Sequence, residues 1–517
     1  MWLLKSPSAN AQPASASRPT AAAVLPVTRR GSSLAYQGGA GLSARGLVTL
    51  ALLVIVPAAG TALTRGFDGL YGQDAYAYFD YATGPLRSAL IHAQPWPAFF
   101  WPPGYPLLVA LLSFVVGPIP VAGQSVSLVM GALVPVLAAL LTRELWPQER
   151  WLPLLAGGLT ALTGQLWQSS MVVMADTTGL ALATLSAFVI VRYAQRHGLP
   201  WLIAATLALT LAILSRWIYG LVALPFAAYV LSGRPPIRHV VAAALVGAAV
   251  LAPVLGPSLL AALREPTADA AFAGNLQVYT WSPLNAVLRD FDTPDGHLSY
   301  ARPNGLYYAL APANLALFGP LLAPAIAIGL FQLPKRAALI VVGWAAVVFA
   351  FHAGAPWQNF RFTLAYVPPL AILIALGVIW AAQKVGIRPT AAYVAIGVAV
   401  MLVGGTRLLT DFVDRHETDV ALVRWTEAQV PADARLLTFG PTLTFTHRSY
   451  LPTQDLFDLP DQELIRPTPT YLLVDVANVE DQWQTKRPAE LYHRLRNGPG
   501  LDALGTFGAY SLYRVGP

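Results

Sequence analysis

The amino-acid sequence predicts a polytopic α-helical membrane protein, and three observations support this prediction. Only 11% of the 517 residues are charged, whereas an ordinary soluble domain carries about 25%. Hydrophobic residues make up 56% of the chain. Apolar runs such as 47–63 and 240–263 are long enough to cross a hydrocarbon core of about 30 Å. These runs lack the alternation of a barrel strand, so we expect helices to satisfy the backbone in lipid.

The basic residues are distributed as topology determinants. The net charge of +7 could indicate nucleic acid, but the basic residues lie in short loops between apolar runs. We therefore expect a lipid bilayer as a partner and no nucleic acid. The chain contains no cysteine, which excludes disulfides, thiolate nucleophiles and cysteine metal ligands. This absence fits a working face outside the cytoplasm.

The N-terminal region differs from the rest of the chain. Residues 1–43 are rich in Ala, Ser and Pro, carry several basic residues and show no apolar periodicity. We expect a disordered cytoplasmic tail here. The run MWLL at the start is too short for the apolar core of a signal peptide.

About eleven transmembrane helices are expected in a membrane domain spanning 44–408, and the apolar segment 105–117 decides their topology. If this segment does not cross, five loops with paired basic residues share the side of the basic N-terminus, as the positive-inside rule requires. Counting it as a crossing would place all five pairs outside. We therefore expect an embedded, non-crossing segment and a cytoplasmic N-terminus. The predicted spans are 44–64, 122–142, 152–170, 177–195, 200–215, 217–232, 239–262, 306–332, 337–353, 363–383 and 390–408.

Because successive spans cross the membrane in opposite directions, the same count of crossings places alternate loops outside the cytoplasm. These loops are 65–121, 171–176, 215–216, 263–305 and 354–362. The long loop 263–305 carries acidic residues and, with the segment that follows, aromatic ones. These aromatics either anchor the loop at the membrane interface or line a substrate groove. The acidic residues are Glu265, Asp269, Asp290, Asp292 and Asp295, and the aromatic residues are Tyr279, Trp281, Tyr307 and Tyr308.

The composition becomes soluble from about residue 411. We expect residues 409–517 to form a small extracytoplasmic α/β domain. An amphipathic helix is predicted over 419–430, strands over 434–440, 470–476 and 509–515, and a further helix near 489–498.

Asp74 is the first candidate for chemistry. It follows the first span, on a predicted short helix with Tyr78 one turn later. A carboxylate near the membrane surface is costly unless it is paired. It could act as a general base on an acceptor hydroxyl or hold a metal ion; the structural alternative is a capping or interfacial aspartate. Asp68 is expected in a turn and Asp80 to be structural or solvated.

The segment WPPGYP (101–106) follows in the same loop. Its prolines remove amide donors and restrict the residues before them, which predicts a fixed turn. The motif indicates geometry and does not by itself indicate catalysis.

Asp176 lies at the predicted outer end of a span, before Thr177 and Thr178. An aspartate at a helix start is a favoured N-cap, which is the structural alternative. The predicted topology places it on the same face as Asp74. Two such carboxylates could divide base and positioning roles or bind a divalent cation together.

Arg216 and Arg361 are expected on this face as well. The planar guanidinium binds two phosphate oxygens, which suits both arginines to a phosphate contact. For Arg216 the alternative is pairing with Asp176 or Asp74, and for Arg361 it is snorkelling to the interface. His352 lies on the same face.

Together these segments resemble the GT-C class of integral membrane glycosyltransferases. The similar branch includes dolichyl-phosphate-mannose protein mannosyltransferase-like, aminoarabinose transferase-like and RgtA/B/C/D-like enzymes. The resemblance covers about residues 44–383 in order. The residues that carry it are Asp74 in GQDAYAYFDYA, the following WPPGYPLL, Asp176 in MADTTGLALATL, Arg216 in LSRWIYGLVALP and Arg361 in NFRFTLAYVPPLA.

This resemblance implies transfer of a hexose or pentose from a polyprenyl-phosphate carrier to an extracytoplasmic acceptor, which could be a glycan, a lipid or a protein. Asp74 would activate the acceptor, Asp176 would be the second acidic position, and the arginines would hold the phosphate. We add His352 and Tyr78 to the expected substrate- and phosphate-binding residues. The expected location is the plasma membrane.

No cofactor follows from the sequence, although a divalent metal at Asp74 and Asp176 stays open. Many relatives carry an acidic pair in the first loop, whereas here Gln73 and Ala75 flank the aspartate, which weakens a metal role. A multi-pass transporter or flippase of a lipid-linked or polar solute is the alternative function, and a non-catalytic scaffold is a third. A transporter predicts charges at span centres and broken, repeated helices. Here most charges lie at span ends.

Overall fold

The computed structural model describes residues 42–264, 281–464 and 468–516, with the side chains of 258–264 excepted. The predicted tail 1–43 lies almost entirely outside the described residues. Glu265, Asp269 and Tyr279 of the predicted outer loop lie outside them as well.

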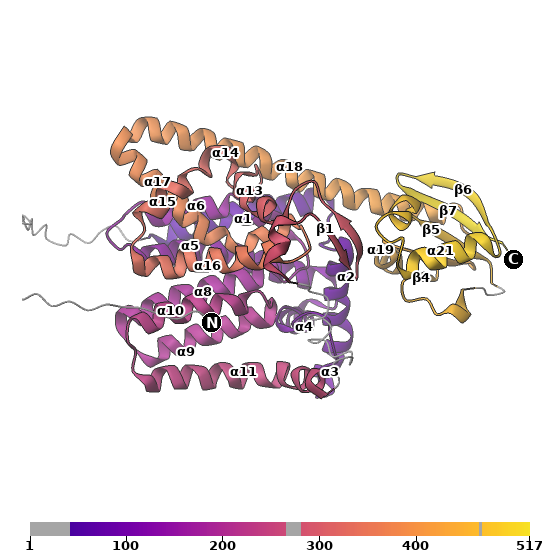
Figure 1. Cartoon of the computed structure of the whole chain (residues 1–517), viewed down its shortest axis with the longest axis horizontal. Helices are drawn as coiled ribbons and strands as arrows, with labels where there is room; N and C mark the ends of the chain where they lie inside the picture. Colours follow the sequence, from indigo (N-terminus) through magenta and orange to yellow (C-terminus); the bar gives the residue numbers. More distant parts are fainter. Residues whose placement is uncertain (1–41, 265–280, 465–467, 517) are drawn as a thin grey trace, which may run out of the picture. The chain divides into compact units, whose positions relative to one another are not determined.

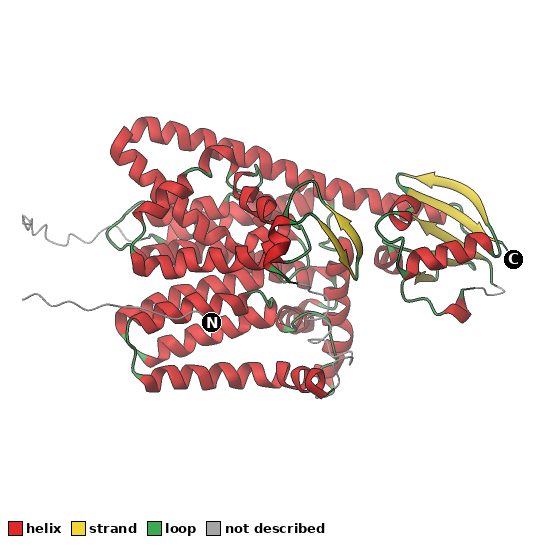
Figure 2. Ribbon diagram, viewed as in Figure 1, coloured by secondary structure: helices red, strands yellow, loops and turns green. Residues whose placement is uncertain are grey.

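The described part of the chain is a multi-pass helical membrane protein with a small sheet near its C-terminus (Figures 1 and 2). Seven of its helices are long and apolar enough to cross a membrane. Six lie in the predicted membrane domain and the seventh extends beyond it. They are α1 (Ala44–Arg65), α5 (Pro120–Leu145), α8 (Asp176–Arg196), α11 (Ile237–Arg264), α16 (Lys335–Gly354), α17 (Val367–Val385) and α18 (Ile387–Glu427).

Four predicted spans fall on shorter helices, and two of those spans are broken. The span 152–170 is interrupted between Ala161 and Gly164, and the span 306–332 is divided into short pieces. Prolines at 312, 320 and 324 explain the second break, because each removes an amide donor from the helix. The helices are α6 (Leu152–Ala161), α7 (Gly164–Met171), α9 (Leu199–Ser215), α10 (Tyr219–Ser232), α13 (Asn304–Leu310), η3 (Ala311–Ala313), α14 (Gly319–Leu322) and α15 (Ala325–Gln332).

The predicted first outer loop, 65–121, is folded into helices rather than extended. The predicted embedded segment 105–117 is helix α4, whose 13 residues span about 20 Å at 1.5 Å per residue, less than a 30 Å core. The elements are α2 (Gly72–Tyr81), the π-helical turn η1 (Ala82–Leu86), α3 (Arg87–Ile91) and α4 (Gly104–Val116).

Gly104, in the WPPGYP segment, allows α4 to pack directly against the end of α9. A Cβ atom at this position would lie 2.6 Å from the carbonyl oxygen of Leu214. Arg216 follows α9 in extended conformation. The predicted fixed turn therefore brings the first outer loop against the backbone that carries Arg216.

The C-terminal region is built on a five-stranded mixed sheet in the order β4-β3-β5-β7-β6. β3 runs parallel to β4 and β5, whereas β7 is antiparallel to β5 and β6. The three predicted strands and the two predicted helices are present, and β4, β6 and α19 were not predicted. The elements are β3 (Arg435–Thr438), α19 (Thr442–Arg448), β4 (Thr453–Asp455), η5 (Asp461–Glu463), β5 (Thr470–Val474), α20 (Val476–Glu480), α21 (Arg487–Asn497), β6 (Leu501–Phe507) and β7 (Tyr510–Val515).

Alternate residues of the central strands enter two separate apolar cores, as the two-residue period of a strand requires. Leu437 and Leu472 pack with α21 on one face of the sheet, and Leu436 and Leu473 pack with the end of α18 and α19 on the other. Both faces are thus covered, which explains why every residue of β3 and β5 is buried.

Helix α18 joins the membrane portion to this sheet without a break (Figure 1). The predicted span 390–408 and the predicted amphipathic helix 419–430 are parts of one 41-residue helix. The predicted domain boundary at 408/409 therefore falls inside a helix. The change from apolar to polar residues marks a change of surroundings along the helix rather than its end.

Candidate functional site

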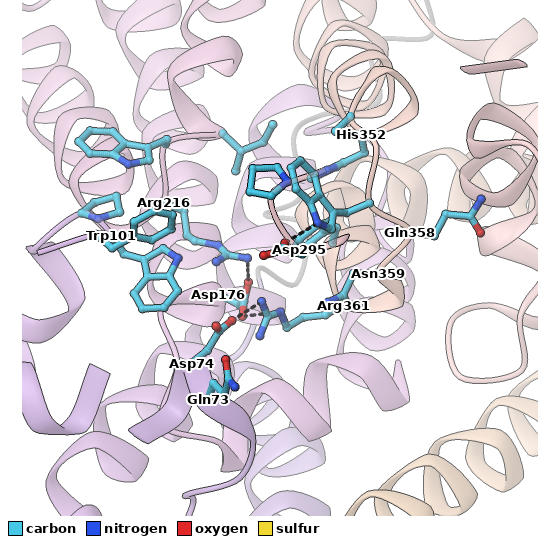
Figure 3. Close-up of a pocket in the computed structure, with 18 of the residues that line it drawn as sticks. Gln73, Asp74, Trp101, Asp176, Arg216, Asp295, His352, Gln358, Asn359 and Arg361 are labelled. Carbon is cyan, nitrogen blue, oxygen red and sulfur yellow. Dashed lines mark hydrogen bonds and ion pairs between the residues drawn. The ribbon is translucent and has the colours of Figure 1, made fainter. Parts of the chain in front are cut away.

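A cavity of about 900 Å³ contains most of the predicted site residues. Its lining includes Asp74, Asp176, Arg216, His352 and Arg361, which come from five separate segments of the chain. Figure 3 shows the two aspartates and the two arginines directed toward one another. The segments predicted to share one face thus meet in one cavity.

Asp74 lies in the first turn of α2, and Arg361 lies in the 3₁₀ turn η4 (Phe360–Tyr366). The Nη2 atom of Arg361 donates a hydrogen bond to Asp74 Oδ2 at 2.8 Å. The Asn359 side chain caps η4 by accepting from the Arg361 amide. About 30% of the Asp74 side chain is exposed, which makes it the most accessible of the four charged groups. Tyr78 lies one turn later on the same helix, as predicted.

Asp176 is the first residue of α8 and not its N-cap. The N-cap position belongs to Ala175, and no side chain caps the helix there. The Asp176 carboxylate instead contacts Arg216 Nη2 at 2.6 Å and Arg361 Nε at 3.6 Å. The capping alternative for Asp176 is therefore wrong, and the pairing alternative for Arg216 is the one that the structure contains. Snorkelling to the interface does not describe Arg361, which is ion-paired inside the cavity.

The four charges form an alternating row, Asp74–Arg361–Asp176–Arg216, with two negative and two positive members. Asp176 lies inside the row with 7% of its side chain exposed, between the two arginines. Both aspartates lie in the first turn of a helix, where the helix dipole favours a negative charge. The ring of Phe362 lies beneath both guanidinium groups, at 5.7 Å from Arg361 and 5.8 Å from Arg216. The helices α2 and α8 therefore stabilise the two aspartates, and the ring of Phe362 stabilises the two arginines.

His352, at the end of α16, lines the same cavity and is 5% exposed. Its ring stacks on Phe362 at 4.9 Å, and neither ring nitrogen has a hydrogen-bond partner among the described residues. Such a buried polar group is costly unless something satisfies it. A ligand in the cavity could do so.

Tyr78 does not belong to the cavity lining. Its ring is fully buried and stacks on Trp101 at 5.1 Å, while Trp101 itself lines the cavity. Burial raises the pKa of the Tyr78 phenol. In this structure Tyr78 therefore does not line the cavity itself but packs against Trp101, which does.

The two aspartates are not part of a larger cluster of metal-ligating side chains in the described residues. No group of three or more His, Asp or Glu side chains with suitable spacing is found there. Asp74 and Asp176 are already neutralised by Arg361 and Arg216. In this structure the two carboxylates are thus engaged by the arginines, and a divalent metal at these residues stays a prediction.

Helix α19 contacts α2 and the turn before it through its side chains. Arg448 Nη2 donates to both Asp68 carboxylate oxygens, at 2.9 and 3.0 Å, and Arg448 Nε donates to the Tyr76 hydroxyl. His447 pairs with Asp80 at 2.9 Å and stacks on Tyr76. Asp68 also accepts from the Leu70 amide, which confirms its predicted place in a turn. We name this set of contacts the α2–α19 clamp.

The sequence prediction missed one side of the cavity. The C-terminal region contributes residues to it, and we name this set the outer wall. The hairpin β1 (Asp290–Thr293) and β2 (Gly296–Ser299) reaches the outer wall, where Gln482 Nε2 donates to the Asp295 carbonyl at 2.6 Å. Trp357 Nε1 donates to Asp295 Oδ2 at 2.9 Å. The outer wall comprises Phe439, Gly440, Asp455, Phe457, Asp458, Asn478, Gln482 and Trp483.

The outer wall could not be found from local motifs, because its residues come from separate turns of the sheet. The nearest signal was the density of Asp and aromatic residues at 455–458. Burial raises the pKa of the Asp455 carboxyl, which accepts hydrogen bonds from the Thr442 hydroxyl and the Phe457 amide.

A second cavity of about 620 Å³ adjoins the first. Trp101 and Trp217 line both. Its other lining residues are almost all proline, aromatic or aliphatic, and include Val254 and Leu255 of α11. An apolar cavity therefore lies behind the two tryptophans.

Comparison with known proteins gives matches in sequence and in fold. Residues 101–258 match the family model of dolichyl-phosphate-mannose-protein mannosyltransferases. A search of curated proteins finds no match.

Among solved structures, ArnT from Cupriavidus metallidurans bound to undecaprenyl phosphate is similar, with a TM-score of 0.60 at 15% identity, over 91% of this chain and 98% of that one. The oligosaccharyltransferase of Archaeoglobus fulgidus in its apo form has a TM-score of 0.56 at 14% identity, over 91% of this chain and 74% of that one. The AglB enzyme of the same organism, in complex with an inhibitory peptide and a dolichol-phosphate, has a TM-score of 0.51 at 12% identity. At these identities the likeness establishes the fold.

Proposed function

We propose that this multi-pass membrane protein transfers a sugar from a polyprenyl-phosphate carrier to an extracytoplasmic acceptor; the family-model match and the GT-C-like fold support this proposal. The observation that carries the proposal is the row Asp74–Arg361–Asp176–Arg216 in a cavity beside an apolar one. Such a row offers both a base and cations for a phosphate.

Arg216 and Arg361 are the proposed phosphate ligands. A guanidinium pairs with phosphate oxygens in a bidentate manner, and two arginines can neutralise the charge that develops on the leaving phosphate. Asp176 contacts both side chains, so we assign it a positioning role. The proposed location of the prenyl chain is the apolar cavity behind Trp101 and Trp217. The solved structures of ArnT with undecaprenyl phosphate and of AglB with a dolichol-phosphate support a carrier of this kind.

Asp74 is the proposed general base. A lone pair of the acceptor hydroxyl or amine attacks the anomeric carbon, and the bond from that carbon to the phosphate oxygen breaks with its electron pair. The acceptor proton passes to Asp74, and the carrier phosphate leaves on the arginines. A single displacement needs only one base and inverts the anomeric carbon. A donor phosphate that binds Arg361 would compete with Asp74 for this cation and would release Asp74 Oδ2 toward the acceptor.

We propose a location in the plasma membrane with about eleven crossings. The N-terminus would be cytoplasmic, and the C-terminal sheet would lie outside with the cavity. The basic loop residues support this orientation. Reporter fusions after residues 427 and 517 test it, and a cytoplasmic signal at both positions would contradict it.

The decisive experiment is transfer from radiolabelled polyprenyl-phosphate sugars in nanodiscs to a membrane-extract acceptor pool. Wild type and Asp74→Asn are compared at equal protein level. We expect labelled product from the wild type and almost none from the variant. Full activity of Asp74→Asn would remove the base role. Movement of a labelled solute across proteoliposomes without any glycosyl transfer would favour a transporter or flippase instead.

A further inference from the structure

We propose that the outer wall is the acceptor subsite, and that the acceptor segment it holds is a saccharide that is uncharged or carries amines, without phosphate or carboxylate groups. This inference rests on the proposed function and names the acceptor class for the same cavity. Its support is the position, the shape and the charge of the outer wall.

The outer wall begins beside the proposed base. Gln73, which precedes Asp74, donates from Nε2 to the Gly440 carbonyl at 3.3 Å. The cavity volume of about 900 Å³ lies near the upper end of the range for pockets that hold whole small ligands. The row of charges occupies the side formed by the helices, and the C-terminal region forms the other. An acceptor on the outer wall therefore lies next to Asp74.

The surface of the outer wall suits a sugar ring. Trp483 meets Phe439 edge-on at a centroid distance of 4.9 Å and Phe457 at 6.0 Å, which fixes its orientation. A fixed aromatic side chain offers a flat apolar surface for the CH groups of a pyranose. The amides of Asn478 and Gln482, which can donate and accept, line the same cavity.

The charge at and beside the outer wall disfavours an anionic acceptor. Asp295, Asp455 and Asp458 line it, and the arginine and lysine residues among the described lining are Arg216 and Arg361 alone. Both arginines are engaged in the charged row, where the donor phosphate is proposed to bind. A phosphate or carboxylate at the outer wall would meet like charges without a cation, which costs binding energy.

His352 is a further polar group that lines the cavity. Its buried ring lacks partners at both nitrogens in the described part of the chain. A neutral imidazole has one donor and one acceptor, and hydroxyl groups of a sugar can satisfy both. A hydroxylated occupant, whether the acceptor or the sugar of the donor, could therefore supply partners for this ring.

The test measures equilibrium binding to the full-length protein in nanodiscs by calorimetry, without donor. The probes are cellotetraose (neutral), a glucosamine tetramer (cationic) and sulfated cellotetraose (anionic). We expect the first two to bind and the third to bind at least tenfold more weakly. Trp483→Ala should weaken binding of cellotetraose about tenfold. Asp455→Asn with Asp458→Asn should weaken the glucosamine tetramer more than cellotetraose.

Trp425 provides the matched control, because it packs against Phe507 away from the cavity. Trp425→Phe should leave binding unchanged, and Trp483→Phe, which retains an aromatic ring, should bind between wild type and Trp483→Ala. Equal binding of the anionic probe, no binding of either other probe, or unchanged binding in Trp483→Ala would each overturn the proposal. If the wild-type protein bound the saccharides as expected but transferred no sugar, this result would contradict the proposed function alone.

Discussion

Arg448 of α19 donates a hydrogen bond to Asp68 at 2.9 Å, although the two residues are 380 positions apart in the sequence. This ion pair joins the C-terminal region to the loop that carries Asp74. The same arginine reaches the Tyr76 hydroxyl, two residues from Asp74 in the sequence. The proposed base is therefore positioned by a distant part of the chain as well as by its own helix.

Replacement of Arg448 by Ala should lower transfer by about 10- to 100-fold, because small displacements of a catalytic group have effects of this size. The loss should appear in kcat with little change in KM for the donor. We expect a destabilisation of about 1–2 kcal/mol, discounted because Asp68 is partly exposed. Arg496→Ala, which removes an exposed pair with Glu480, is the control and should change neither quantity. Equal losses in both variants would argue against the clamp.

Asp74→Asn should reduce kcat by about 10²- to 10⁴-fold, the usual contribution of a general base. Binding of the donor should change little, because the amide keeps the size of the side chain. Rapid-quench measurement of product at saturating donor checks the rate. Asp80→Asn, on the same helix, removes one contact of the α2–α19 clamp but no reacting group, and it should lose much less activity than Asp74→Asn. A comparable loss in Asp80→Asn would mean that α2 responds to any charge change.

Arg216→Lys should weaken binding of polyprenyl phosphate by about 10- to 100-fold, because lysine cannot reproduce a bidentate pair. It should also expose Asp176 as an incompletely paired buried carboxylate. A double-mutant cycle of Arg216→Met with Asp176→Asn should recover part of the stability lost in Arg216→Met, since removal of both charged partners is less harmful than removal of one. Additive losses in the cycle would show that the two side chains are not coupled.

His352→Phe should raise KM for the sugar donor or acceptor about tenfold while preserving the stacking on Phe362. His352→Gln, which keeps a donor and an acceptor, should retain more affinity than His352→Phe. Steady-state kinetics with both substrates varied separates the two partners. If His352→Phe behaved as wild type, the imidazole would have a packing role only.

Gly104→Ala should destabilise the protein by about 1–3 kcal/mol and lower activity, because its Cβ would press on the Leu214 carbonyl and shift the backbone before Arg216. Gly60→Ala within α1 meets nothing within 4 Å and should be neutral or slightly stabilising. Thermal unfolding in detergent compares the two. An unchanged melting temperature for Gly104→Ala would contradict the close contact of α4 with α9.

The charged row could be anticipated because its members mark the ends of apolar runs. The distribution of basic residues between alternate loops was enough to predict one shared face for Asp74, Asp176, Arg216 and Arg361. The pairing itself could not be predicted, since the choice between phosphate contact and ion pair depends on distances that spacing does not encode. In the structure both arginines are paired to the aspartates.

The outer wall and the α2–α19 clamp lay beyond prediction for a different reason. His447 and Asp80 are 367 positions apart, and no local period connects them. The end of α18 was misplaced because polarity was used as the criterion. Residues 409–427 contain neither proline nor glycine, so the helix continues after the apolar stretch ends.

Because α18 is one continuous helix, its length sets the angle and the height of the C-terminal sheet relative to the membrane portion. Each inserted residue would turn the C-terminal sheet by about 100° and lift it by about 1.5 Å. One insertion near residue 412 would therefore carry the outer wall away from Asp74, and seven would restore the angle to within about 20° but add roughly 10 Å of height. The length of this helix is thus as much a part of the site as any side chain in it, and chain-length variation should be tolerated in the surface loops before it is tolerated here.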